Sequence, residues 1–148
     1  MYKCIFVPTD GSDLSARAVA TAIDLALLSS AELVCVTVEH LQPYGYFEGS
    51  MVFNQRELEH LQEQADAAAQ ELVAAVKPAA LAKGVRSVQT AVVKSNQIAE
   101  AIIATSRRFQ CDMIVMASHG RRSLARLLMG SETLHVLTHS HIPVLVLR

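Results

Sequence analysis

The strongest constraint on the fold of this chain is a regular alternation between short apolar runs and longer segments with helical spacing. Five short runs, rich in Val, Ile and Leu, predict strands at residues 3–7, 33–39, 87–93, 112–117 and 143–147. Between them, apolar residues recur with helical spacing at residues 14–30, 55–82, 98–107 and 131–139. Strands that alternate with helices in this way form a parallel sheet, because each helix carries the chain back to the same end of the sheet.

We therefore predict a single α/β domain over residues 1–148, built as a three-layer sandwich with a five-stranded parallel sheet in the middle. If strand four returns beside strand one, right-handed crossovers give the strand order 3-2-1-4-5. Sheets of this kind bind ligands beyond the carboxyl ends of the strands, where the strand order reverses. The predicted crevice lies between two loops, at residues 8–12 and 117–131.

Local signals refine this outline. Ser12 is a suitable N-cap for the first helix, Pro78 should kink the long second helix or end its main part, and Gly84 should close it. We expect residues 43–53, which hold two glycines and four of the chain's aromatic residues, to form a mobile loop. The apolar side of the second helix is predicted to consist of Leu58, Leu61, Ala65, Ala68, Leu72 and Val76.

Composition narrows the function. The formal net charge of -1 offers no strong field for nucleic acid, and no apolar stretch reaches the length of about 20 residues that a membrane span needs. The three cysteines, Cys4, Cys35 and Cys111, lie within or beside apolar runs and favour small buried side chains in a reducing compartment. We expect a soluble, cytoplasmic protein that binds neither nucleic acid nor membrane.

The loop at residues 117–131 carries the clearest chemical signal. It reads Ala117-Ser118-His119-Gly120, then nine residues, then Gly130-Ser131 at the start of a predicted helix. Glycine lets backbone N–H groups approach an anion, and a helix N-terminus supplies unpaired donors with partial positive charge. This arrangement predicts a phosphate-binding site.

Several segments, taken in order, resemble the universal stress protein family over the whole chain. They are residues 7–12 (VPTDGS), 111–116 (CDMIVM), 118–120 (SHG), 127–131 (LLMGS) and 143–146 (PVLV). The ATP-binding branch of that family shows the pattern G-x2-G-x9-G-[ST], which this chain matches at Gly120, Gly130 and Ser131. It departs at the first position, where Ala117 replaces glycine. A positive φ at Ala117 would cost on the order of 1 kcal/mol, or less than tenfold in affinity.

The resemblance implies a Rossmann-like fold with the topology of the adenine nucleotide alpha-hydrolases, and an ATP site. The backbone around Gly120, Gly130, Ser131 and Glu132 would hold the phosphates, and Asp10 would bind the ribose or help to hold Mg2+. Val38 would present backbone groups to the adenine. The candidate nucleotide-binding residues are Pro8, Thr9, Asp10, Val38, Met116, Ala117, His119, Gly120, Arg121, Gly130, Ser131 and Glu132.

Each of these signals has an ordinary alternative. Asp10 could be only a turn residue, Arg121 and Arg122 could be solvated, and His119 could structure its loop rather than act as an acid or base. His135 and His139 stand four residues apart, as metal ligands can, but no third ligand accompanies them, which favours an ordinary helix surface.

The last predicted strand, Pro143, Val144, Leu145, Val146 and Leu147, ends one residue before the end of the sequence. An apolar edge strand without cover tends to pair, and in the resembled family it pairs with its own copy, so we predict a homodimer. The aromatic residues Tyr44, Tyr46 and Phe47 could cover the adenine or pack on the partner subunit.

Three functions remain open. The first is a regulatory ATP-binding protein of the stress response, with a regulatory protein partner that the sequence does not identify. The second is a slow Mg-dependent ATP hydrolase that relies on Asp10, since the chain lacks a GxxxxGK[ST] loop and its phosphate-binding Lys. The third is a scaffold that binds no nucleotide and acts through its dimer surface.

Overall fold

The fold is seen in a computed structural model that describes residues 1–41, 54–120 and 129–148. Every predicted strand and helix is present, and each end lies within one residue of its predicted position. The elements are β1 (Cys4–Pro8), α1 (Asp13–Ser29), β2 (Glu32–Glu39), α2 (Gln55–Ala82), β3 (Val88–Lys94), α3 (Ile98–Arg108), β4 (Met113–Ala117), α4 (Ser131–His139) and β5 (Val144–Leu147).

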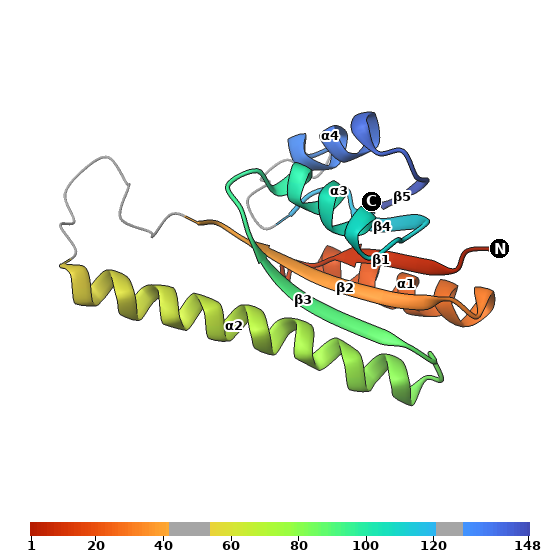
Figure 1. Cartoon of the computed structure of the whole chain (residues 1–148), viewed down its shortest axis with the longest axis horizontal. Coiled ribbons are helices and arrows are strands. Elements are labelled where there is room, and N and C mark those ends of the chain that lie inside the picture. Colours follow the sequence, from red (N-terminus) through yellow and green to blue (C-terminus); the bar gives the residue numbers. More distant parts are fainter. Residues whose placement is uncertain (42–53, 121–128) are drawn as a thin grey trace.

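The five strands form one parallel sheet in the order β3-β2-β1-β4-β5, which confirms the predicted topology. The chain first moves outward from β1 through β2 to β3 and then crosses back to add β4 on the other side of β1 (Figure 1). The strand order therefore reverses between β1 and β4. This is the position at which sheets of this class bind ligands.

Alternate residues of the central strands divide the core between the two faces of the sheet. Ile5, Val7 and Cys35 pack on the face covered by α1 and α2. Phe6 and Ile114 pack on the other face, which α3 and α4 cover (Figure 1). Because both faces are covered, the strands are apolar at nearly every position, as a parallel sheet requires.

The α2 helix spans the predicted residues 55–82, and Pro78 lies within it rather than ending it. The exposed proline leaves only the carbonyl of the equally exposed Ala74 without its helical donor, so the helix continues to Ala82. The apolar side of the helix differs from prediction at one alanine. Ala68, predicted on the apolar side, is exposed, and the neighbouring Ala69 is buried instead. As predicted, Gly84 follows the helix with a φ of 104° and donates its N–H to the Leu81 carbonyl (2.9 Å).

The amino-terminal end of α2 projects past the ends of β2 and β3 (Figure 1). No helix within the described ranges is long and apolar enough to cross a membrane.

Candidate nucleotide site

The loops after β1 and β4 meet at Asp10 and Gly120. A Cβ built on Gly120 would lie 2.6 Å from Oδ2 of Asp10, so glycine leaves room for the Asp10 carboxylate in its observed position. The two loops that were predicted to line the crevice therefore lie side by side at the reversal point. It brings a carboxylate against a glycine backbone at the carboxyl ends of the two central strands.

Thr9 holds the first loop in place. It is buried, its N–H donates to the Val36 carbonyl (2.9 Å), and its own carbonyl accepts from the Thr37 hydroxyl (2.9 Å). The Thr9 and Ser15 hydroxyls are hydrogen-bonded to each other at 3.0 Å. Thr9 therefore holds the loop in place, and its N–H, carbonyl and hydroxyl all form hydrogen bonds within the protein.

Asp10 follows this anchor and is partly exposed. Its Oδ1 accepts the N–H of Ser12 at 3.0 Å, which fixes the carboxylate in a short turn. Ser12 in turn caps α1, as predicted, because its Oγ accepts the N–H of Ser15 (3.2 Å). Pro8, the last residue of β1, is half-buried below this turn and pairs in register with Val36.

Ala117, where the sequence pattern is broken, is the last residue of β4. It pairs in register with Leu147 of β5, and its carbonyl accepts the Thr133 hydroxyl at 2.9 Å. Among the described residues, positive φ at a residue other than glycine occurs at Ser30 and Gln110, not here. The alanine therefore carries no left-handed backbone strain, and the cost considered for a positive φ does not arise.

A backbone hydrogen bond joins the two ends of the second loop. The Gly130 N–H donates to the Ser118 carbonyl at 2.7 Å, and a Cβ on Gly130 would meet that same oxygen at 3.3 Å. Ser118 is itself buried and is hydrogen-bonded through its hydroxyl to Nδ1 of His119 (3.1 Å). We call the Ser118–Gly130 bond the loop clasp. It brings the start of α4 next to the end of β4.

Among the described residues, no side chain caps the N-terminus of α4. Its N-cap residue is Gly130, whereas Ser12 caps α1 and Asn54 caps α2 through a capping box with Glu57. Ser131, the first helical residue, is exposed. The first backbone N–H groups of a helix have no acceptor within it, so those of α4 remain available to an anion.

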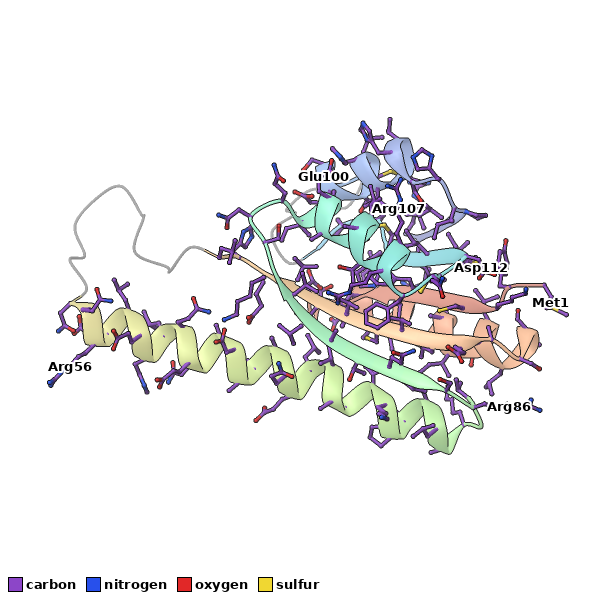
Figure 2. The ribbon with its side chains drawn as sticks, in the orientation of Figure 1. Met1, Arg56, Arg86, Glu100, Arg107 and Asp112 are labelled. Carbon is purple, nitrogen blue, oxygen red and sulfur yellow. The ribbon has the colours of Figure 1, made fainter. Side chains whose placement is uncertain are left out.

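Glu132 lies in the first turn of α4 and would repel an anion if its carboxylate faced its own helix end. Instead, Oε2 of Glu132 accepts the N–H of Ala99 at 2.8 Å, at the start of α3. Its negative charge therefore stabilises the N-terminus of the neighbouring helix, α3. A second tie between the two helices joins His135 Nε2 to Glu100 Oε1 at 2.7 Å, and Figure 2 shows Glu100 on α3 beside α4.

Val38 lies near the end of β2 with its backbone directed toward β1. In a parallel strand, the backbone groups of every second residue point to the same neighbouring strand. The Glu32 N–H donates to the Lys3 carbonyl and the Val36 carbonyl accepts the Thr9 N–H, so the even-numbered residues of β2 point to β1. The pairing of β2 with β1 ends at Val36. The N–H and C=O of Val38 therefore point past the end of β1, toward the loop that holds Asp10.

The remaining predicted residues are placed differently. Met116 is buried in the core on the α3 and α4 face, so its side chain belongs to the packing of the sheet. Arg121, Arg122 and the aromatic residues at 44–47 lie outside the described residues. The described part of the chain holds no group of three or more His, Cys, Asp or Glu side chains arranged to bind a metal ion.

An acidic pair beside Val38 was not predicted. Oε2 of Glu39 is buried, and within the described ranges it has no hydrogen-bond donor. Burial, and then the neighbouring Asp66 carboxylate, raise the pKa of Glu39. Asp66 itself forms an ion pair with Lys94 (2.8 Å), which lowers its pKa. The sequence does not indicate this cluster, because Asp66 on α2 is far in sequence from Glu39 and Lys94 and approaches them only in the folded chain.

Comparison with known proteins agrees with this architecture. The sequence profile described as the universal stress protein family matches residues 1–148. Universal stress protein MJ0531 of Methanocaldococcus jannaschii is 33% identical over 150 aligned residues, which cover 100% of this chain and 83% of that protein.

Two solved structures share the fold. Universal stress protein UspA from Lactobacillus plantarum superposes with a TM-score of 0.78 at 24% identity, covering 99% of this chain and 98% of the other. A universal stress protein solved in complex with cAMP gives a TM-score of 0.71 at 23% identity, covering 99% and 97%.

Proposed function

The chain belongs to the universal stress protein family, and we propose that it binds ATP with Mg2+ as a regulatory ligand between the β1 and β4 loops. The observation that carries the proposal is the approach of Asp10 to Gly120 beside the uncapped N-terminus of α4. A similar fold has been solved with a nucleotide, cAMP, which supports a nucleotide as the class of ligand.

The residues present fit the phosphates of such a ligand. The backbone N–H groups at the start of α4, from Ser131 onward, supply donors and a partial positive charge. Gly120 and Gly130 place no side chain in the path of the phosphates to the N-terminus of α4. The Glu132 carboxylate points toward α3 and so does not repel the phosphates. In the proposed complex these groups bind the triphosphate, and a contact from Arg121, which lies outside the described residues, stays a prediction.

The nucleoside end fits the strands. The backbone of Val38 can hydrogen-bond to the edge of the adenine ring, and Pro8 lies below it. Asp10 can accept a hydrogen bond from a ribose hydroxyl or contribute one carboxylate oxygen to Mg2+. Bound Mg2+ would neutralise phosphate charge in this arrangement. These assignments place the ligand across the point where the strand order reverses.

Regulation is favoured over catalysis. Asp10 is the one carboxylate that the proposal places next to the phosphates, and the chain has no phosphate-binding Lys in a GxxxxGK[ST] loop. A slow Mg-dependent hydrolase therefore stays the second candidate, and turnover at or above about 1 per second would make it the first. A scaffold that binds no nucleotide is the outcome if no ligand is found.

The direct experiment is to denature the purified protein and identify the released small molecules, and then to titrate ATP and cAMP by calorimetry. We expect ATP to bind in the micromolar range. Asp10→Asn should weaken binding, whereas the matched control Asp13→Asn, on the exposed first turn of α1, should not. No released nucleotide and no thermal shift at millimolar ATP would favour the scaffold that binds no nucleotide.

We also propose a homodimer through β5. The strand lies at one edge of the sheet, and Leu145 on it is 37% exposed. Leu134 and Leu137 of α4, the helix that contacts β5, are exposed as well, so exposed apolar side chains lie on both the edge strand and its neighbouring helix. Light scattering at micromolar concentration should give twice the chain mass, and Leu145→Glu should give the monomer. A wild-type mass of one chain would refute the dimer.

The cytoplasmic location and the regulatory protein partner stay predictions.

A further inference from the structure

Two thiols that lie 107 positions apart in the sequence are in contact in the fold. Sγ of Cys4, at the start of β1, lies 3.0 Å from Sγ of Cys111, just before β4, and both residues are less than a tenth exposed. We propose that Cys4 and Cys111 form a peroxide-sensitive dithiol whose oxidised form is an intramolecular disulfide.

The strand pairing holds the two cysteines together. Asp112 donates its N–H to the Cys4 carbonyl (2.9 Å), and its Oδ1 accepts the N–H of Cys4 (3.0 Å). These bonds clamp the start of β1 against the residue that follows Cys111. Both thiols also point to the carbonyl of Phe109, at 3.8 and 4.0 Å. To form a disulfide, the sulfurs must approach by only about 1 Å, to the usual bond length of about 2.05 Å.

The two thiols have different roles. The hydrogen bond from the Cys111 thiol lowers the pKa of Cys4, although burial and the nearby Glu32 and Asp112 carboxylates oppose this. The same contact raises the pKa of Cys111. Cys4 also lies three residues from the exposed Met1, so a peroxide reaches it first, and we assign Cys4 the attacking role and Cys111 the resolving role.

The oxidant is a hydroperoxide, such as hydrogen peroxide. The Cys4 thiolate attacks one peroxide oxygen, the O–O bond breaks, and hydroxide leaves, which produces a sulfenic acid on Cys4. The Cys111 sulfur then attacks the Cys4 sulfur, the S–O bond breaks, and the thiol proton leaves with the oxygen as water. In sum, two thiols and one H2O2 give one disulfide and two water molecules.

The dithiol lies at the opposite end of the sheet from the proposed nucleotide site. Figure 2 shows Asp112 at the end where the chain begins, near Met1, which is 96% exposed. A peroxide can reach Cys4 when the first residues of the chain open locally, without movement of the loops at Asp10 and Gly120. Oxidation is therefore independent of nucleotide binding, and failure of either proposal leaves the other standing.

Cys35 provides an internal control. It lies on the other face of the sheet, is 0% exposed, and its pKa is raised to about 12 by burial. The proposal requires that Cys35 stay reduced under conditions that oxidise the other two.

The test treats the purified wild-type chain with a small excess of hydrogen peroxide. We expect the three free thiols to fall to one, and the intact mass to fall by about 2 Da. Trypsin places each cysteine on a different fragment, at residues 4–17, 18–56 and 109–121. Fragments 4–17 and 109–121 should appear joined, and dithiothreitol should separate them.

Variants then assign the roles. Cys35→Ala should oxidise like the wild type, whereas Cys111→Ala should retain a sulfenic acid on Cys4 that dimedone traps. Three thiols that remain reduced in the wild type, a disulfide between two chains, or a gain of about 32 Da without a joined peptide would each overturn the proposal. Because these three outcomes are measured on the wild-type chain, they test the disulfide even if a variant fails to fold.

Discussion

The contact between Gly120 and Asp10 makes a substitution at Gly120 the most informative perturbation of the proposed site. In Gly120→Ala, the new Cβ would lie 2.6 Å from Oδ2 of Asp10, so the carboxylate must move by several tenths of an ångström. Gly120 is exposed and its φ lies outside the left-handed region, so the backbone tolerates alanine. We expect the free energy of unfolding to change by less than about 1 kcal/mol.

Ligand binding should change much more. A hydrogen bond to a charged group contributes about 1.5–3 kcal/mol, so displacing the Asp10 carboxylate should raise the Kd for ATP by roughly 10- to 150-fold. Asp10→Ala should have a similar effect on its own. In the Asp10→Ala background there is no carboxylate left to displace, and Gly120→Ala should then weaken binding by less than about threefold.

Calorimetric titration of ATP into the four proteins of this double-mutant cycle measures the coupling. Denaturant unfolding of each variant controls for stability. The reasoning is refuted if Gly120→Ala weakens binding by the same factor with and without Asp10. Gly120 would then act on the ligand through its own backbone.

Three further predictions concern single residues. Ala117→Gly should change the ATP affinity by less than about tenfold and lower stability by about 0.5–1 kcal/mol, because the position is a strand residue without positive φ; calorimetry and urea unfolding measure the two effects. Glu132→Ala should lower stability by about 1 kcal/mol in urea, because it removes the cap on the Ala99 N–H, and Glu132→Gln should lower it less. The pKa of Glu39 is raised above 4.5 in the folded chain, so the folded chain holds this proton more tightly than the unfolded chain. The protonated Glu39 therefore contributes fully to the free energy of unfolding below pH 4.5, and this contribution is lost as the pH rises through the folded pKa. Glu39→Gln, with an amide facing Asp66, should therefore be more stable than wild type at pH 7 and nearly equal at pH 4; equal stabilities at both values in urea would contradict the raised pKa.

The sheet was predictable because burial on both faces leaves a signal at every strand position. An uninterrupted apolar run such as 33–36 has few alternatives within an alternating pattern. The second helix gave a weaker signal, since alanine fits either side of a helix. Ala68 and Ala69 could not be distinguished by sequence, and only the angle at which α2 crosses the sheet decides which of them is buried.

The site was predictable in part, for a related reason. Topology places the ends of β1 and β4 side by side, so the loops at 8–12 and 117–131 were expected to line one crevice, whereas the contact between Asp10 and Gly120 is seen only in the structure. Contacts that depend on side-chain direction were not accessible. The redirection of Glu132 toward α3, and the meeting of Cys4 with Cys111, depend on rotamers and strand register that no residue pattern encodes.

The loop clasp has a consequence for how members of such a family can diverge. The hydrogen bond from the Gly130 N–H to the Ser118 carbonyl (2.7 Å) fixes the distance between the two ends of the loop. The sheet and α4 therefore keep the same relative position whatever residues connect these two ends. Doubling the length of a flexible loop costs only about 0.6 kcal/mol in closure entropy. The fold therefore does not demand nine residues between Gly120 and Gly130, and the ligand is what can select that length. A segment transplanted at this junction should exchange ligand preference while the sheet beneath it stays the same.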